Sequence, residues 1–182
     1  MSVSIRDPQR FTVFNGEVLF AGDSIVTVDR HTVALLKAKA LENQRKRIRL
    51  CAHQGLQDAV HEMFIVHAQD TYVRPHKHLE GESFHVIEGR ADLVVFDGEG
   101  GLAEVIRLGD YASALTFYYR LREPAYHTLL VRSDVVVFHE TKQGPFIPSD
   151  TIFAPWAPEG TEEPAARAFM SRVAQAVAAR RP

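Results

Sequence analysis

The chain contains a single cysteine, Cys51, among its 182 residues. An intrachain disulfide is therefore excluded, and with it the disulfide framework that is typical of small secreted domains. No residue near Cys51 in the sequence marks it as a nucleophile, so we expect a buried or half-buried small hydrophobic side chain.

Long apolar runs and an excess of either charge are also lacking. No stretch approaches the roughly 18 consecutive apolar residues of a membrane span, and the N-terminal segment lacks the apolar run of a signal peptide. The net charge is −2, which gives no general attraction to nucleic acid or to anionic membranes. We therefore expect a cytoplasmic protein whose partner is a small molecule, with no binding to nucleic acid or membrane.

The length and composition favour one domain with a sizeable core. Hydrophobic residues make up 46% of the chain, and neither an internal repeat nor a low-complexity linker interrupts it. Within this one domain we expect N-terminal strands and a helix (1–46), a barrel (47–160) and a C-terminal helix (161–182). Phe169 and Val173 lie at helical spacing in the last part, which indicates an amphipathic helix that docks on its own barrel or on a second subunit.

The N-terminal part shows a change from strand to helix patterning. Residues 11–28 contain three short β-rich runs, and Asn15-Gly16 between the first two predicts a hairpin. Asp29 is a residue type that caps helices, and it precedes a segment, 30–43, whose apolar residues follow a helical stripe. This helix is expected to lean on the body of the fold.

From residue 63 to residue 142 the chain consists of short runs rich in Val, Ile, Phe and Tyr, separated by turn residues such as Asp97-Gly98. No helical period intervenes, which disfavours a βαβ architecture. The pattern predicts a mainly β protein with an antiparallel β-barrel or sandwich over about residues 47–142. The expected strands from residue 63 are 63–68, 71–78, 83–89, 90–97, 103–108, 111–120, 126–131 and 134–142.

The stretch 71–89, TYVRPHKHLEGESFHVIEG, contains candidate metal ligands. His76 and His78 are two residues apart, so on a strand their side chains point to the same side. Gly81 permits the chain to turn, which allows a carboxylate oxygen of Glu82 to join the two imidazoles. Such a set suits a divalent transition metal, and Fe, Mn, Zn, Ni and Co are all compatible with it.

The alternative for this stretch is a polar surface turn beside an acidic patch. Phe84 and Val86 share the parity of Glu82 on the following strand, so its inward face is expected to carry one ligand and then core. His85 has the opposite parity, which favours a surface position.

The segment QRKRIRLCAH contains a basic row. On a strand, Arg47, Arg49 and His53 lie on one face, and Ile48 and Leu50 lie on the other. One interpretation is a solvated edge strand whose charges discourage pairing with other chains. The other is a substrate-binding wall at the barrel mouth, because guanidinium groups bind carboxylate or phosphate in a two-pronged manner.

The spacing His-x-His, three residues, Glu, six residues, Gly89 resembles the first motif of the cupin superfamily. This resemblance implies a cupin-type barrel (double-stranded β-helix) and a fourth metal ligand from a later strand, for which His127 in REPAYHTLLV is the candidate. Asp70 and Val131 depart from the cupin pattern, which has glycine and asparagine there. Residues from about 29 to 160 resemble the WbuC family of cupin-fold metalloproteins in RKRIRLCAH, YVRPHKHLEGESFHVIEG, AYHT, HETKQGPF and FAPWAPE.

The WbuC family tends to accompany genes for bacterial surface polysaccharides, so the resemblance implies a sugar or nucleotide sugar as substrate. The leading hypothesis is a metal-dependent enzyme, such as an isomerase, epimerase or oxygenase, in which Arg47 and Arg49 hold an anionic end of the substrate. Tyr72 and Lys142 are further substrate-binding candidates.

Two other functions remain open on the sequence. One is a non-catalytic metal-dependent binding or sensing module, for which the same ligands would serve. The other is a metal-free epimerase, which is disfavoured because the metal ligands would then be redundant. Paired barrels are common among cupins, so a homodimer is expected, and exchange of the first hairpin between subunits is left open.

Overall fold

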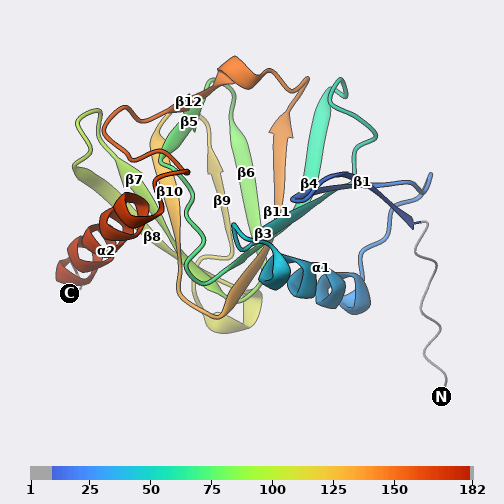
Figure 1. Cartoon of the computed structure of the whole chain (residues 1–182), viewed down its shortest axis with the longest axis horizontal. Coiled ribbons are helices and arrows are strands. Elements are labelled where there is room, and N and C mark those ends of the chain that lie inside the picture. The colour runs from blue at the N-terminus through green and yellow to red at the C-terminus, as the bar shows by residue number, and fades with distance from the viewer. Residues whose placement is uncertain (1–9, 181–182) are drawn as a thin grey trace.

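Two β-sheets face each other in this protein, and one helix lies outside each sheet (Figure 1). The structure is a computed structural model, and it describes residues 10–180. The strands are β1 (Phe11–Asn15), β2 (Val18–Ala21), β3 (Arg47–Cys51), β4 (Val60–Ala68), β5 (His76–His78), β6 (Glu82–Glu88), β7 (Arg90–Phe96), β8 (Leu102–Gly109), β9 (Tyr118–Leu121), β10 (Tyr126–Val131), β11 (Val135–Gln143) and β12 (Thr151–Phe153).

The order of the strands defines the two layers. The seven-stranded sheet has the order β1-β2-β3-β4-β11-β6-β9, and the five-stranded sheet has the order β12-β5-β10-β7-β8. Neighbouring strands pair antiparallel, with the exception of the parallel pair β2 and β3. The predicted mainly β sandwich and the predicted N-terminal hairpin are therefore confirmed.

The first helix, α1 (Arg30–Glu42), covers the outer face of the seven-stranded sheet. As predicted, Asp29 caps it, because its Oδ1 accepts a hydrogen bond from the backbone N of Thr32 at 2.9 Å. Leu36 and Ala40 are fully buried against apolar residues of β3 and β4. Since α1 occupies the apolar face of β3, the arginines of that strand are directed to the space between the sheets.

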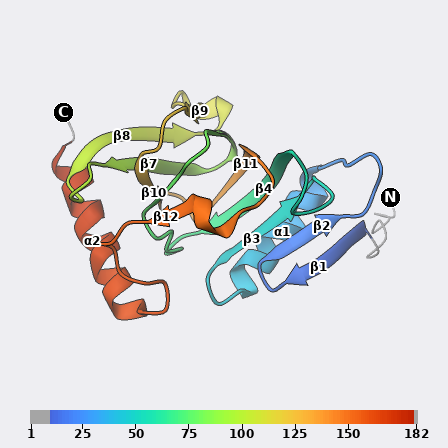
Figure 2. The same cartoon turned by 90° about the horizontal axis from the view of Figure 1, so that it is seen from above.

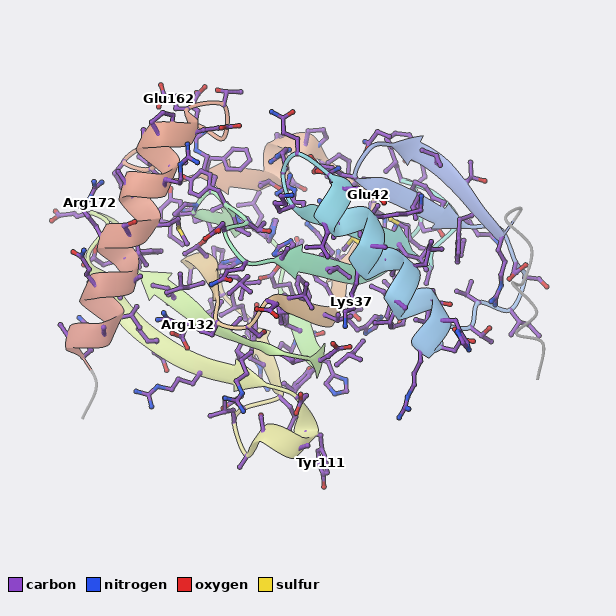
Figure 3. The ribbon with its side chains drawn as sticks, turned by 60° about the horizontal axis from the view of Figure 1, so that its bottom comes forward. Lys37, Glu42, Tyr111, Arg132, Glu162 and Arg172 are labelled. Carbon is purple, nitrogen blue, oxygen red and sulfur yellow. The ribbon has the colours of Figure 1, made fainter. Side chains whose placement is uncertain are left out.

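The second helix, α2 (Glu163–Ala179), covers the outer face of the five-stranded sheet. Its Phe169 and Val173 are buried against Val94, and the ring of Trp156 lies 6.1 Å from that of Phe169. The helix thus docks on its own sandwich, at the end opposite the N-terminal hairpin (Figure 2). Figure 3 shows α1 and α2 on opposite sides of the molecule. Neither helix within residues 10–180 combines the length and apolarity needed to cross a membrane.

The main core lies between the sheets. Phe84, Val86 and Phe138 contribute from the seven-stranded sheet, and Leu93 and Leu129 contribute from the five-stranded sheet. The rings of Phe84 and Phe138 stack with their centroids 3.8 Å apart. This core is apolar and contains none of the predicted metal ligands, so its hydrophobic contribution to folding does not depend on an ion.

Gly89 makes the tight link from β6 to β7. Its φ is +87°, a backbone conformation that residues with a side chain rarely adopt. A Cβ at this position would lie 2.2 Å from the carbonyl oxygen of Val135. The last glycine of the histidine-containing motif is therefore a structural requirement of this turn.

Two predicted strand regions are shorter than expected. Residues 71–75 form no strand, because Pro75 lacks the N–H group that a ladder needs, and β5 begins at the next residue. The run 111–120 is extended only in β9. Before it, Oδ1 of Asp110 accepts a hydrogen bond from N of Ala112 at 3.1 Å and caps a short 3-10 helix. A third β-rich run, at 24–28, joins no strand.

Candidate metal centre and substrate pocket

Strands β5, β6 and β10 bring the four predicted metal ligands together. His76 and His78 both lie on β5, and His127 of β10 is directly opposite His76 in the strand pairing. Glu82 is the first residue of β6 and is buried. The alternation of buried and exposed residues along β6 agrees with the inward parity expected for Glu82, and His85 is exposed as predicted.

The Glu82 carboxylate contacts two imidazoles. Its Oε1 lies 3.0 Å from Nε2 of His127, and its Oε2 lies 3.4 Å from Nε2 of His78. The ring centroid of His76 lies 4.7 Å from that of His127 and 4.8 Å from that of His78. These four side chains form a cluster, although among residues 10–180 no three donors are already set around a common point for an ion.

The chemistry of the donors fits a divalent transition metal. Nδ1 of His76 lies 2.8 Å from the carbonyl oxygen of Arg74, and Nδ1 of His127 lies 2.9 Å from that of Ala125. In each case Nδ1–H donates to the carbonyl, and this arrangement orients metal-binding histidines in general, because it leaves Nε2 as the ligand atom. Ligands at right angles around an ion with bonds of about 2.1 Å lie about 3 Å apart. The nitrogen–oxygen separations around Glu82 are of this size.

Burial keeps two of these histidines neutral. It lowers the pKa of His76 to about 3 and that of His78 to about 4, so both are neutral near pH 7, which is the form that binds metals. Burial alone would raise the pKa of Glu82, but the hydrogen bond and charge of His127 hold it at about 2. Burial likewise opposes protonation of His127, yet the hydrogen bond to Glu82 raises its pKa. The cluster therefore contains an ionised carboxylate.

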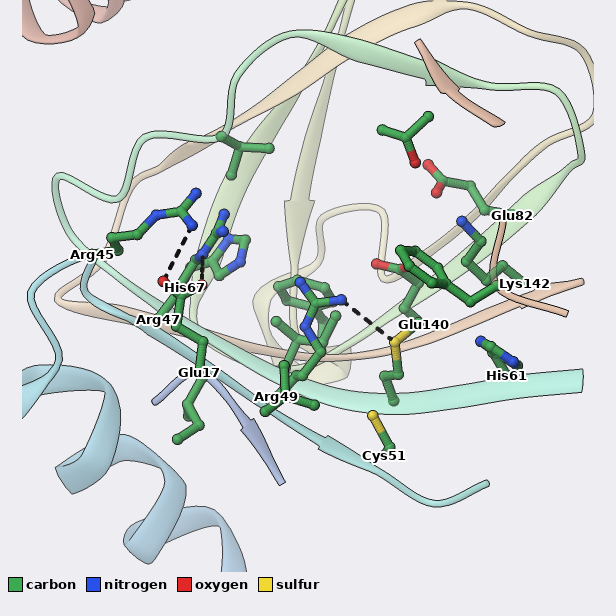
Figure 4. A pocket seen from close by; sticks show the side chains of 18 of the residues that line it. Glu17, Arg45, Arg47, Arg49, Cys51, His61, His67, Glu82, Glu140 and Lys142 are labelled. Carbon is green, nitrogen blue, oxygen red and sulfur yellow. Dashed lines mark hydrogen bonds and ion pairs between the residues drawn. The ribbon is translucent and has the colours of Figure 1, made fainter. Parts of the chain in front are cut away.

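A cavity of about 800 Å³ lies beside the cluster, and all four candidate ligands line it. Three of the predicted substrate-binding residues, Arg47, Arg49 and His53, line the same cavity. Lys142 lines it as well, and its Nζ lies 3.3 Å from Nδ1 of His78. Figure 4 shows Arg47 and Arg49 along the wall that leads to Lys142.

The position of β3 argues against the edge-strand interpretation of its arginines. β3 lies between β2 and β4, and the edges of its sheet are β1 and β9. The Arg47 guanidinium pairs through Nε with Oε2 of Glu17 at 2.7 Å, and the side chain of Arg47 is only 18% exposed. The guanidinium group of Arg47 therefore lies in the pocket wall and not at an edge of the sheet.

Tyr72 lies elsewhere, in contrast to the expectation that it would approach the substrate. It is not among the residues that line the cavity. Its ring centroid lies 6.5 Å from that of Phe169 of α2, and its hydroxyl donates to the carbonyl oxygen of Pro158 at 2.8 Å. The apolar ring is thus used in packing beneath the C-terminal helix, which leaves it no role in the pocket.

Sequence reasoning missed Glu140, which lines the cavity from β11. It pairs with Phe84 of β6 and Met63 of β4, so it lies in the middle of the seven-stranded sheet. Burial, and then the charge of Glu82, raises the pKa of Glu140 to about 7. Its presence in the family-like stretch HETKQGPF was the only signal for it.

Cys51 lines the cavity as well, but burial raises the pKa of its thiol to about 11, which agrees with an unreactive side chain.

We expect Glu140→Gln to stabilise the protein above pH 7. The folded state raises the pKa of Glu140 from 4.5 to about 7, so it binds the proton more tightly than the unfolded chain does. Stability is then lost as the pH rises from about 4.5 through about 7, and glutamine removes this loss. Urea unfolding at pH 5 and pH 8, with a chelator present, measures the effect. Glu104→Gln, at an exposed position of β8, is the control, and an equal pH-dependent loss in Glu140→Gln and wild type would contradict the expectation.

The comparisons with known proteins leave the function open. A family model described as "Domain of unknown function (DUF6016)" matches residues 28–108, which is less than half of the chain. No curated protein matches the sequence. Several solved structures match part of this chain.

Three of these structures indicate the extent of the similarity. A Shewanella oneidensis protein is 12% identical, with a TM-score of 0.46 over 56% of this chain and 66% of that chain. A mutant of Bacillus subtilis oxalate decarboxylase is 15% identical, with a TM-score of 0.43 over 53% and 24% of the two chains. A DMSP lyase structure is 16% identical, with a TM-score of 0.40 over 52% and 43%. This chain covers less than two thirds of each of these chains, and the resemblance to the WbuC family stays a prediction.

Proposed function

We propose that this chain is a metal-dependent cupin enzyme that acts on a small, anionic, oxygenated substrate such as a sugar or a nucleotide sugar. The observation that carries the proposal is the cluster of three histidines and Glu82 beside a cavity of about 800 Å³. Pockets for small molecules and cofactors have volumes of about 300–1,000 Å³, so the cavity has room for a substrate of this class.

The residues of the pocket have separable roles in this proposal. The cluster would hold a divalent transition metal ion such as Fe, Mn, Zn, Ni or Co, and a bound ion polarises a carbonyl or hydroxyl oxygen of the substrate. Arg47 and Arg49 bind the anionic end of the substrate and fix its orientation. Lys142, next to His78, adds a positive charge beside the reacting end.

The choice of a sugar rests on sequence resemblance. The stretches shared with the WbuC family support a role in the biosynthesis of bacterial surface polysaccharides, whose intermediates are phosphorylated or carboxylated sugars and nucleotide sugars. The arginines of the pocket wall are compatible with either a phosphate group or a carboxylate group.

Metal content and turnover test the proposal together. Protein purified without added metal is expected to contain about one transition metal ion per chain by elemental analysis. The metal-loaded protein is then screened against a panel of phosphorylated and carboxylated sugars and nucleotide sugars, and turnover of at least one is expected. Binding without turnover across the panel would favour the sensing module, and protein that takes up no metal would overturn the proposal.

A further inference from the structure

The cavity has two chemically different ends. In Figure 4, Arg45, Arg47 and His67 gather at one end, while Glu82 and Lys142 lie at the other. The strand that carries the arginines, β3, is separated from the strand that carries the carboxylate, β6, by β4 and β11. Three strand spacings amount to about 14 Å across the sheet. The arginine end can therefore bind one part of a ligand while another part reaches the metal ligands.

The arginine end has an excess of positive charge. Arg45 and Arg47 lie at this end, and Arg49 follows along β3 in the direction of Glu140 (Figure 4). One carboxylate, that of Glu17, pairs with the first two: Oε2 lies 2.7 Å from Nε of Arg47 and Oε1 lies 3.2 Å from Nη1 of Arg45. Arg49 has no carboxylate within ion-pair distance among residues 10–180, and its Nη1 lies 4.0 Å from Sδ of Met63. Among residues 10–180, one carboxylate thus lies at ion-pair distance from these three arginines. The pKa of Glu140, whose charge also interacts with that of Arg49, is raised to about 7, so Glu140 offsets only part of the remaining positive charge.

His67 adds an unpaired polar group at the same end. It is opposite Arg47 in the pairing of β3 with β4, lines the cavity and is 7% exposed. Its Nδ1 is buried and has no hydrogen-bond partner within residues 10–180. Buried polar atoms are nearly always paired in folded proteins, because leaving one unpaired costs free energy. Burial, and then the charges of the arginines, lower the pKa of His67 to about 3, so it is neutral and can donate one N–H.

We propose that Arg49, His67 and the free nitrogen atoms of Arg47 bind the dianionic phosphate of a phosphorylated substrate, an inference that rests on the proposed function of the same pocket. A phosphate dianion compensates more of this excess positive charge than a monocarboxylate does. Guanidinium nitrogens and an imidazole N–H also match the several oxygen atoms of a phosphate. The preferred substrates are therefore sugar phosphates or nucleotide sugars, and carboxylated sugars are disfavoured.

Binding of inorganic phosphate to the chelator-treated protein tests this site by isothermal titration calorimetry. Arg49→Gln and His67→Asn are each expected to weaken phosphate binding about tenfold or more, since a charge-assisted hydrogen bond contributes on the order of one such factor. Arg107→Gln, at an exposed position of β8 outside the cavity, is expected to bind as wild type does. Acetate, a monocarboxylate, is expected to compete poorly with phosphate for this site. Equal affinities of Arg49→Gln and Arg107→Gln, or no phosphate binding by wild type, would overturn the site.

Two further measurements test the site in the wild-type protein and its role in binding a substrate. The side-chain Nε–H signals of arginine in wild-type protein are followed by NMR during the phosphate titration, so the site is tested even where a variant does not fold. A shift at Arg49 supports the site, and shifts confined to arginines outside the cavity refute it. A sugar phosphate is expected to bind more tightly than inorganic phosphate, and the reverse order would indicate a site for free phosphate and refute a substrate role.

The same titration of His76→Ala distinguishes this inference from the proposed function. The arginine end lies apart from the histidine cluster, so His76→Ala is expected to bind phosphate with the affinity of wild type even after chelation. Phosphate binding by wild-type protein that takes up no metal would uphold the phosphate site and overturn the metal-dependent function. Loss of phosphate binding in folded His76→Ala would instead refute an independent phosphate site.

Discussion

Replacing Glu82 by alanine is expected to abolish stoichiometric metal binding, and His76→Ala is expected to do the same. Glu82 supplies an ionised carboxylate and contacts the imidazoles of both His78 and His127, so its loss removes a charged ligand and the group that aligns two others. The drop in metal affinity should exceed the roughly 10–100-fold drop that follows loss of a group outside the ligand sphere. Elemental analysis of each variant, purified without added metal, measures it.

His85→Ala is the matched control for these variants. His85 lies on the same strand as Glu82 but on its exposed face, so its loss should leave the metal content unchanged. All three variants are expected to keep the strand content of wild type by circular dichroism, because the core between the sheets contains none of the replaced residues. Full metal content in both Glu82→Ala and His76→Ala would refute the assignment of the ligands.

The parts of the fold that the sequence predicts well are those set by local chemistry. Asn15-Gly16 predicts the hairpin of β1 and β2, and Asp29 predicts the start of α1, because turn and cap preferences act within a few residues. The parity of Glu82 and Phe84 on β6 is similarly local, since side chains alternate along any strand.

The parts that the sequence does not predict depend on which strands become neighbours. His67 stands in an apolar run with no motif to mark it, and the only signal for Glu140 is its place in the family-like stretch HETKQGPF. Both become pocket residues because β4 and β11 lie in the middle of the seven-stranded sheet. Tyr72 is the opposite case. It is close to the metal ligands in sequence, but its ring packs beneath α2 in the outer core and does not line the pocket. β12, which pairs with β5, was likewise not predicted, because its partner is far away in the sequence.

Phe138→Ala is expected to lower the free energy of unfolding by about 3–5 kcal/mol, the usual cost of removing a buried phenylalanine side chain. Phe138 is 1% exposed, and its ring is the end of a stack that continues through Phe84 to Tyr119, with the latter two centroids 5.0 Å apart. Because β11 and β6 fix the backbone on both sides of the stack, the neighbouring rings cannot close the gap fully. Urea unfolding of the metal-free protein measures the loss.

Phe14→Ala is the control for this measurement, because Phe14 is 59% exposed and its loss should change the free energy of unfolding by no more than about 0.5 kcal/mol.

Phe84 and Phe138 also line the cavity, so the stack is at once core and pocket wall. Phe138→Ala should therefore enlarge the cavity and weaken substrate binding while the metal ligands, which lie on other strands, keep their ion. A variant as stable as Phe14→Ala would contradict a core built on this stack. Loss of metal from the folded variant would show that the stack also positions the ligand cluster.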